Sequence, residues 1–269
     1  MAERFRLDCS YLGGRYYGWQ HQPGVKTVQA LLENALGKLF DLEITVFASG
    51  RTDRGVHALN QSVHFDADPA DGPPFNRWKQ LLNIWLPLDV RVRSITNTDK
   101  QFHARHSAQW RVYGYRFTKM KPDRLKPLQR WRFQPGTWHL EAARNAVDIL
   151  DGSVPTEMFC GSGGSGYEAE NWPLTLQLRR LKENEFWLLV AAKSFRYKMV
   201  RCLAGTVGAC LAGDLSCADL IKQLETGHRT FHPAPASGCF LLAVYYEKDY
   251  DSISCFDKSW QRVIEFVDL

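Results

Sequence analysis

Two kinds of hydrophobic periodicity alternate along this chain, and their order is what most constrains the fold. Apolar residues recur at every second position in 5–11 and form a β-type pattern in 109–118, which predicts strands. Residues 28–39 instead place apolar side chains three or four positions apart after Thr27, which predicts an N-capped helix. Further helices are predicted near 75–85, 140–150, 197–212 and 216–226, and further strands near 43–49, 62–66, 90–96, 174–181, 185–193 and 239–247.

The order of these elements predicts an α+β fold made of two halves. Strand-helix-strand-strand-helix-strand is read in the first half and, more loosely, again in the second. Two α+β halves that share a mainly antiparallel sheet account for this order more simply than a doubly wound parallel sheet. We expect an N-terminal half at 1–119, a connecting segment rich in proline and basic residues at 120–138, a C-terminal half at 139–250 and an extension at 251–269.

Composition and charge narrow the class of protein. The 269 residues are 45% hydrophobic and 23% charged, which is ordinary for a globular protein, and the net charge of +5 permits a polyanionic partner without requiring one. Seven cysteines without a CxxC pair do not form the pattern of a disulfide framework. The chain shows neither a signal-peptide pattern nor an 18-residue apolar run, so we expect a soluble cytoplasmic protein.

The stretch FASGRTDRGVHAL at 47–59 is the first candidate site. It places one carboxylate and two arginines between two glycines, at the exit of a predicted strand. One interpretation is a plain turn with solvated charges. The other is that Asp53 lies on a tight backbone where a ligand can reach it, with Arg51 or Arg54 available to a phosphate. An aspartate so placed can act as a nucleophile or general base.

The stretch FHARHSAQWRVYGYRF at 102–117 is the second candidate site. Arg105, Arg111 and Arg116 alternate with histidine, tryptophan and tyrosine side chains. Arginine and aromatic planes on a strand are what proteins use to stack on unpaired bases. The alternative is an amphipathic strand with one face in water.

A third candidate is the apolar helix predicted at 197–212. Met199, Leu203, Val207 and Leu211 fall on one stripe and belong to the core. Arg201 lies near the start of that helix, where it either faces water or pairs with a carboxylate.

Motifs for metals and nucleotides are missing from the sequence. The pairs His228/His232 and His103/His106 are not accompanied by CxxC or HExxH. No GxxxxGK[ST], GxGxxG or GxSxG motif occurs either. We therefore expect no metal site and no nucleotide cofactor.

The segment GRTDRGVHALNQSVHFD at 50–66 resembles the signature of the TruA family of tRNA pseudouridine synthases. The segments that resemble other motifs of this family, in the same order, are YLGGRYYGWQHQPGVKTVQALLENAL, LLNIWLPLDVRV, FHARHSAQWRVYGYRF, FRYKMVRCLAGTVGACLAG and APASGCFLLAVYYE. Together they cover most of residues 5–247. The segment at 156–171 does not reproduce the family pattern.

The resemblance implies a reaction and the residues that perform it. Members of this family detach uracil from its ribose, rotate it and rejoin it through C5, without a cofactor or metal. The aspartate of GRTD is their catalytic residue and falls on Asp53; Arg201 is implied as its salt-bridge partner, and Tyr113 as the residue that stacks on the target base. Arg51 would help to displace that base. The other residues expected to bind substrate are His57, Arg54, Arg105 and Arg111.

The resemblance also implies partners and an architecture. The family acts as a homodimer, with one tRNA across both subunits, on uridines 38, 39 and 40 of the anticodon stem-loop. Its two halves share a continuous antiparallel sheet, with helices on one side and a central active-site cleft. The alternative hypothesis is an RNA-binding or tRNA-folding protein of the same fold, with different RNA targets or little catalytic activity.

Overall fold

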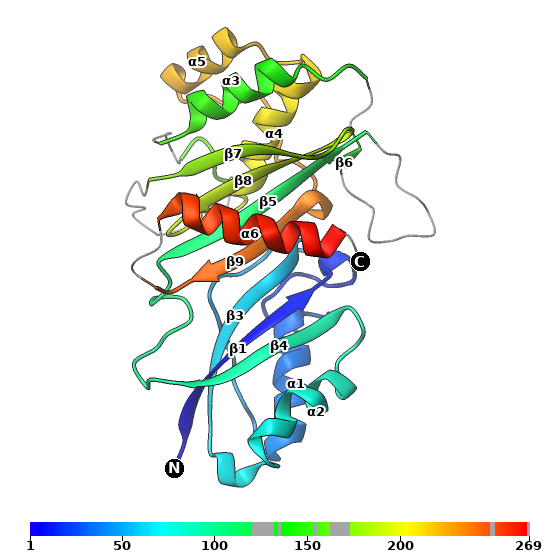
Figure 1. The fold of residues 1–269 in the computed structure, drawn as a ribbon, viewed down its shortest axis with the longest axis vertical. Helices are drawn as coiled ribbons and strands as arrows, with labels where there is room; N and C mark the ends of the chain where they lie inside the picture. Colours follow the sequence, from blue (N-terminus) through cyan, green and yellow to red (C-terminus); the bar gives the residue numbers. More distant parts are fainter. Residues whose placement is uncertain are drawn as a thin grey trace. The chain divides into compact units, whose positions relative to one another are not determined.

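The computed structural model describes residues 1–119, 132–133, 136–152, 155, 157–161, 173–247 and 251–267, which form two compact units (Figure 1). The first consists of Met1–Gln109 and Leu241–Asp249, and the second of Trp110–Phe240 and Tyr250–Leu269. Both contain strands and helices, so the predicted α+β class is confirmed. The predicted boundaries at 119 and 139 stay a prediction, and most of the segment 120–138 lies outside the described residues.

The sheet of the first unit is built around three antiparallel strands. The central strand β1 (Glu3–Tyr11) pairs with β3 (His57–Ala67) on one side and with β4 (Val90–Thr98) on the other. The short strand β2 (Phe47–Ala48) pairs with β3. Short 3₁₀ turns occupy Gly13–Arg15, Pro69–Asp71 and Phe75–Arg77.

Two helices cover one face of this sheet, because β1 and β3 direct large apolar side chains toward them. Helix α1 (Val28–Phe40) begins after Thr27, whose hydroxyl accepts a hydrogen bond from the Ala30 amide at 3.4 Å, as predicted. Helix α2 (Trp78–Trp85) brings its first residue edge-on to the ring of Phe40, with centroids 4.8 Å apart. The aromatic cluster between helices and strands consists of Phe5, Phe40, Phe65, Phe75 and Trp78.

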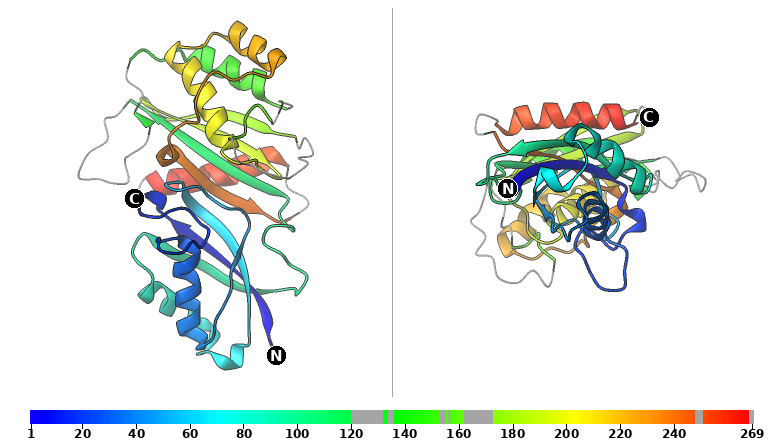
Figure 2. Two further views of the ribbon diagram at one scale, coloured as in Figure 1. Left: turned by 180° about the vertical axis from the view of Figure 1, so that it is seen from behind. Right: turned by 90° about the horizontal axis from the view of Figure 1, so that it is seen from below.

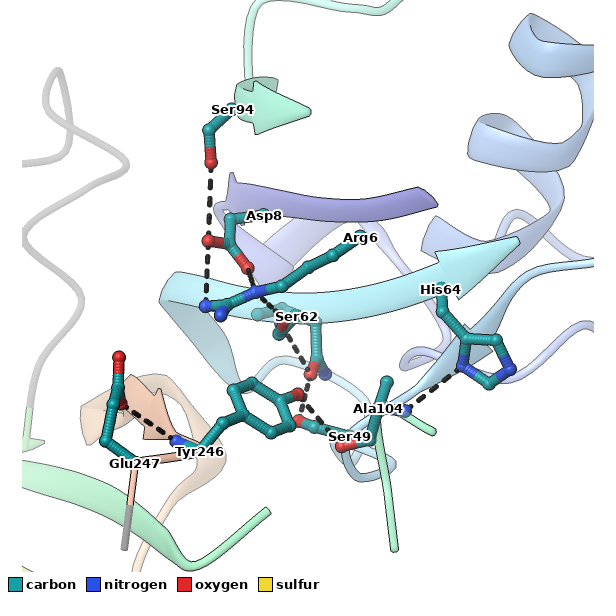
Figure 3. Close-up of polar contacts among 10 residues, drawn as sticks. Arg6, Asp8, Ser49, Ser62, His64, Ser94, Ala104, Tyr246 and Glu247 are labelled. Carbon is teal, nitrogen blue, oxygen red and sulfur yellow. Dashed lines mark hydrogen bonds and ion pairs between the residues drawn. The ribbon is translucent and has the colours of Figure 1, made fainter. Parts of the chain in front are cut away.

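The opposite face of the same sheet is polar, and its charges are paired within the unit. Arg6 donates from Nε to Asp8 and to the hydroxyl of Ser62, both at 3.0 Å, and Ser94 donates to Asp8 at 3.3 Å (Figure 3). The guanidinium of Arg6 also lies 4.5 Å from the ring centre of Tyr246. The polar side chains of this face are therefore bonded to one another, within the first unit.

The second unit has its own antiparallel core of strands. Strand β8 (Glu185–Ala192) lies between β5 (Trp110–Thr118) and β7 (Thr175–Lys182), and β6 (Arg132–Phe133) runs parallel to β5. Strand β9 (Cys239–Tyr245) is divided between the units, with its first two residues counted in the second unit and the rest in the first.

Helices cover both faces of β5 and β8, which explains why nearly every residue of these two strands is buried. Helix α4 (Met199–Ala212) packs on one face together with α3 (Leu140–Leu150), which also contacts α5 (Cys217–Thr226). Helix α6 (Ser252–Val267) contacts β5 and β8 from the other face (Figure 2). The expectation of helices on one side alone is therefore wrong for the second unit.

Two further sequence predictions need correction. The strand expected at 43–49 is reduced to β2, because side chains of α1 satisfy the backbone of Val46: its amide donates to Glu33 and its carbonyl accepts from Gln29. The extension at 251–269 contains a helix, α6, that the sequence interpretation missed. The apolar stripe of α4 is confirmed as core, and none of the described helices has the length and apolar character to cross a membrane.

Candidate functional site

The loop between β2 and β3, residues 49–56, is held at its start by a buried glutamine. Ser49 donates from its amide to the Ser62 carbonyl at 2.8 Å and from its hydroxyl to the Gln61 side-chain oxygen at 2.6 Å. The amide nitrogen of Gln61 donates to the Gly50 carbonyl at 2.8 Å. Both ends of one buried amide therefore bind the first two residues of the loop.

The middle of the loop is held by the last residue of β1 and by the segment that follows this strand. The hydroxyls of Tyr11 and Thr52 share a hydrogen bond of 2.8 Å, and the Trp19 amide donates to the Thr52 carbonyl at 3.0 Å. Thr52 is only 7% exposed. Buried hydrogen bonds on both side chain and backbone fix the residue that immediately precedes Asp53.

Two glycines make this close approach possible. Gly18 has φ +92°, and a Cβ there would lie 2.7 Å from the Thr52 carbonyl oxygen. At Gly13 a Cβ would lie 1.9 Å from the Val56 carbonyl oxygen. The Gly13 amide donates to Nδ1 of His57 at 3.2 Å, so this buried histidine joins the loop segments.

The charged residues of the loop project from this fixed backbone. Asp53 is half-buried, and its carbonyl accepts from the Val56 amide at 3.1 Å across a tight turn in which Gly55 has φ +83°. Arg51 is exposed, and the exposed Arg54 lies with its guanidinium 4.1 Å from the centre of the Tyr17 ring. The structure thus places Asp53 on a tight backbone next to a strand, with a side chain that is not fully buried.

Tyr113 and Arg201 belong to the second unit. Tyr113 lies on β5 opposite Val190, is 9% exposed and meets the ring of Phe195 edge-on at a centroid distance of 5.0 Å. Arg201, in the first turn of α4, donates from Nε to the Ala234 carbonyl at 2.8 Å. Both side chains are held in defined orientations by neighbours from other segments of this unit.

The segment 102–117 is not a single arginine-rich strand. Strand β5 begins at Trp110, and the exposed Arg105 lies in a preceding turn that belongs to the first unit. Arg111 is 7% exposed and donates to the Lys193 carbonyl. Arg116 forms a buried ion pair with Glu185, so the interpretation of Arg116 as a residue that stacks on bases is wrong.

His64 has an unusual electrostatic environment on the polar face of β3. Its ring stacks on Phe47 with centroids 5.0 Å apart, and its Nδ1 accepts from the Ala104 amide at 3.1 Å (Figure 3). Burial, and then the neighbouring His103 and Arg4, lower the pKa of His64 to about 4. His64 is therefore a neutral acceptor that anchors the turn before β5.

Sequence reasoning missed the residues that support the loop, above all Tyr11 and Gln61. A signal was present: Gln61 stands in the same inward register of β3 as Val63 and Phe65, where a polar side chain needs a buried partner. Within the part of the chain that the structure describes, no three histidine, cysteine or acidic side chains are grouped so as to hold a metal ion.

A half-buried carboxylate on a loop that is fixed from two sides has the support that a catalytic group requires. Residues 9–107 and 146–247 match the model of a family described as tRNA pseudouridine synthase, and the chain belongs to this family.

Curated relatives named tRNA pseudouridine synthase A match over nearly the whole chain. The relative from Rippkaea orientalis is 33% identical over 250 residues, which cover 91% of this chain and 84% of the relative. The relative from Geobacillus kaustophilus is 33% identical, and the match covers 93% of this chain and 96% of the relative. The relative from Chlamydia muridarum is 35% identical, and the match covers 93% of this chain and 94% of the relative.

Proposed function

We propose that this chain isomerises uridine to pseudouridine in tRNA, at positions 38, 39 and 40 of the anticodon stem-loop. The bond from N1 to C1′ of the ribose breaks, a bond from C5 to C1′ forms, the hydrogen of C5 leaves to solvent and N1 takes up a proton. Family membership over most of the chain carries this proposal, and the fixed loop around Asp53 supports it.

Asp53 is the proposed catalytic carboxylate. Its backbone is fixed at Thr52 and Val56 while its side chain is only half-buried, so a substrate atom can approach it. Addition of the carboxylate to the pyrimidine, addition to the sugar and assistance to a glycal route are all compatible with this position. An isomerisation has no net redox change, so the proposed reaction consumes no oxidant or reductant.

Arg201 and Tyr113 complete the proposed catalytic set. We also propose that the two units share a continuous sheet and form a central cleft in which these residues meet Asp53. Arg201 would pair with the carboxylate and keep it ionised when water is excluded. Tyr113 would stack on the extruded base. The bonds that orient Arg201 and the ring contact of Tyr113 support these roles.

The exposed arginines are the proposed contacts to RNA. Arg51 would displace the target base or fill its place in the helix, and Arg54 and Arg105 would bind phosphates. His57 and Arg111, which are buried, are proposed to contribute to substrate binding as well. We also propose a cytoplasmic homodimer that binds one tRNA across both subunits.

Tritium release tests this proposal directly. Unmodified tRNA labelled with [5-³H]uridine is incubated with the protein without added nucleotide, and the modified positions are then mapped. We expect release, with pseudouridine at 38, 39 or 40. Release from other positions would keep the chemistry and reject the site. Binding of tRNA without any release would reject the enzyme and favour the RNA-binding alternative.

A further inference from the structure

The side chain of Gln61 is fully buried and uses both ends of its amide. Its oxygen accepts from the Ser49 hydroxyl at 2.6 Å and from the Ser62 amide at 3.2 Å. Its nitrogen donates to the Gly50 carbonyl at 2.8 Å and lies 3.5 Å from the hydroxyl of Tyr11. A side-chain amide of this length donates and accepts at once without having to titrate.

The chemistry of these partners fixes the orientation of the amide. The Gly50 carbonyl can only accept and the Ser62 amide can only donate. If the amide of Gln61 were reversed, its oxygen would face the Gly50 carbonyl oxygen and its nitrogen would face the Ser62 amide, and neither pair could form a hydrogen bond. The side chain therefore has one stable orientation, and this orientation determines where the Gly50 carbonyl lies.

Gln61 and Tyr11 together hold three of the four residues that precede Asp53 in the loop. Gln61 binds Ser49 and Gly50, and Tyr11, at the end of β1, binds Thr52. All these groups are in the first unit and most are nearly inaccessible to water. A shift of the Gly50 carbonyl would carry Asp53 with it, because only two residues separate them.

We propose that Gln61 is a positioning residue for the reaction: it holds the loop in the conformation in which the Asp53 carboxylate meets its substrate. This inference rests on the proposed function. Gln61 does not touch the substrate; it acts through Gly50 and, with Tyr11, through Thr52. A displacement of about 1 Å at a reacting group can lower a rate by about 100-fold.

The test compares Gln61→Leu and Gln61→Met with a control at another amide, Asn83→Leu. Methionine is of similar length but cannot donate to the Gly50 carbonyl. Asn83 is also a side-chain amide that both donates and accepts: it donates to the Val92 carbonyl at 2.9 Å and accepts from the Val92 amide at 2.8 Å, and so joins α2 to β4 rather than to the loop at 49–56. Folding is checked by circular dichroism and thermal unfolding.

The decisive readout is the single-turnover rate constant of tritium release at saturating enzyme, because partial unfolding lowers the amount of active protein but not this constant. We expect both Gln61 variants to lose about 10- to 100-fold in this rate constant. Their dissociation constant for tRNA should stay within about twofold of the wild type, since the residue makes no RNA contact. Asn83→Leu should keep the wild-type rate constant.

Each other outcome has a definite meaning. Folded Gln61 variants with the wild-type rate constant would overturn the inference, and so would an equal loss in Asn83→Leu. If both Gln61 variants fail to fold, Tyr11→Phe decides, because it removes only the hydroxyl bound to Thr52; it should lower the rate constant at unchanged tRNA affinity, and no change would overturn the inference. Wild-type protein without tritium release would instead reject the proposed function itself.

Discussion

Arg201 and Ala234 are joined by two hydrogen bonds in opposite directions. The Ala234 amide donates to the Arg201 carbonyl at 2.8 Å, and Nε of Arg201 donates back to the Ala234 carbonyl at 2.8 Å. The bond at Nε fixes the plane of the guanidinium, so its outer edge has a set direction. This is the geometry that a planar, two-pronged partner of a carboxylate needs.

Arg201→Lys should therefore lower turnover although it keeps the charge. Lysine has no planar edge and cannot reproduce both the Nε bond and a two-pronged pairing. We expect a fall in kcat of about 10- to 1000-fold in the tritium assay. The control is Arg180→Lys, since the exposed Arg180 also donates from Nε to a backbone carbonyl, that of Lys182. Equal activity of the two variants would contradict the proposed role of Arg201.

Gly18→Ala should disturb the loop that carries Asp53 more than Gly24→Ala does. Both glycines have positive φ, +92° and +76°, so both substitutions cost about 1–2 kcal/mol of backbone strain. Only at Gly18 does the added Cβ also meet backbone, the Thr52 carbonyl oxygen at 2.7 Å; at Gly24 nothing lies within 4 Å. Gly18→Ala should therefore show a lower free energy of unfolding in urea and a lower turnover than Gly24→Ala. A similar loss in the two variants would mean that contact with Thr52 is unimportant.

The buried ion pair of Arg116 and Glu185 gives a prediction about stability. Glu185→Ala leaves the Arg116 charge without its carboxylate in the interior, and should lower the free energy of unfolding by about 3–5 kcal/mol. Asp66→Ala removes the partner of Arg4 at the surface and should cost about 1 kcal/mol or less. Chemical denaturation of both variants measures the difference, and comparable losses would show that burial of the first pair is unimportant.

His64 makes stability depend on pH in a defined window. Its pKa in the folded protein is lowered from 6.5 to about 4, so the unfolded chain binds more protons between these values. The contribution of neutral His64 is complete above pH 6.5 and is lost as the pH falls toward 4. The pKa of His103 is lowered as well, chiefly by burial, so part of the slope belongs to it.

The variant His64→Asn isolates this contribution, since asparagine can accept from the Ala104 amide without titrating. Between about pH 6.5 and about pH 4, its free energy of unfolding should fall less steeply than that of the wild type. An identical slope would show that His64 is not the group that titrates.

The sequence predicts those features of the fold that depend on local pattern. Thr27 and the apolar face after it are sufficient to predict α1, and the GRTD stretch points to Asp53. Helix α6 also had a local signal that the sequence interpretation did not use, because Cys255, Phe256 and Val263 recur at helical spacing and are buried.

Other features depend on partners far away in the chain and could not be predicted from local pattern. The predicted strand at 43–49 was shortened because Gln29 and Glu33 on α1 satisfy the backbone of Val46. The local sequence around Arg116 is compatible with an RNA contact, because its actual partner, Glu185, lies 69 residues later in the chain. The support of Asp53 by Gln61 likewise requires the pairing of β3 to be known.

The most direct test of the central claim, that Asp53 is the catalytic carboxylate on a prebuilt loop, is tritium release by wild type and by Asp53→Asn. Both are measured on [5-³H]uridine-labelled tRNA, together with the dissociation constant for that tRNA. We predict release by the wild type, a loss of at least about 1000-fold in the variant, and affinities within a few fold of each other. Release by Asp53→Asn at a rate near that of the wild type would contradict the account.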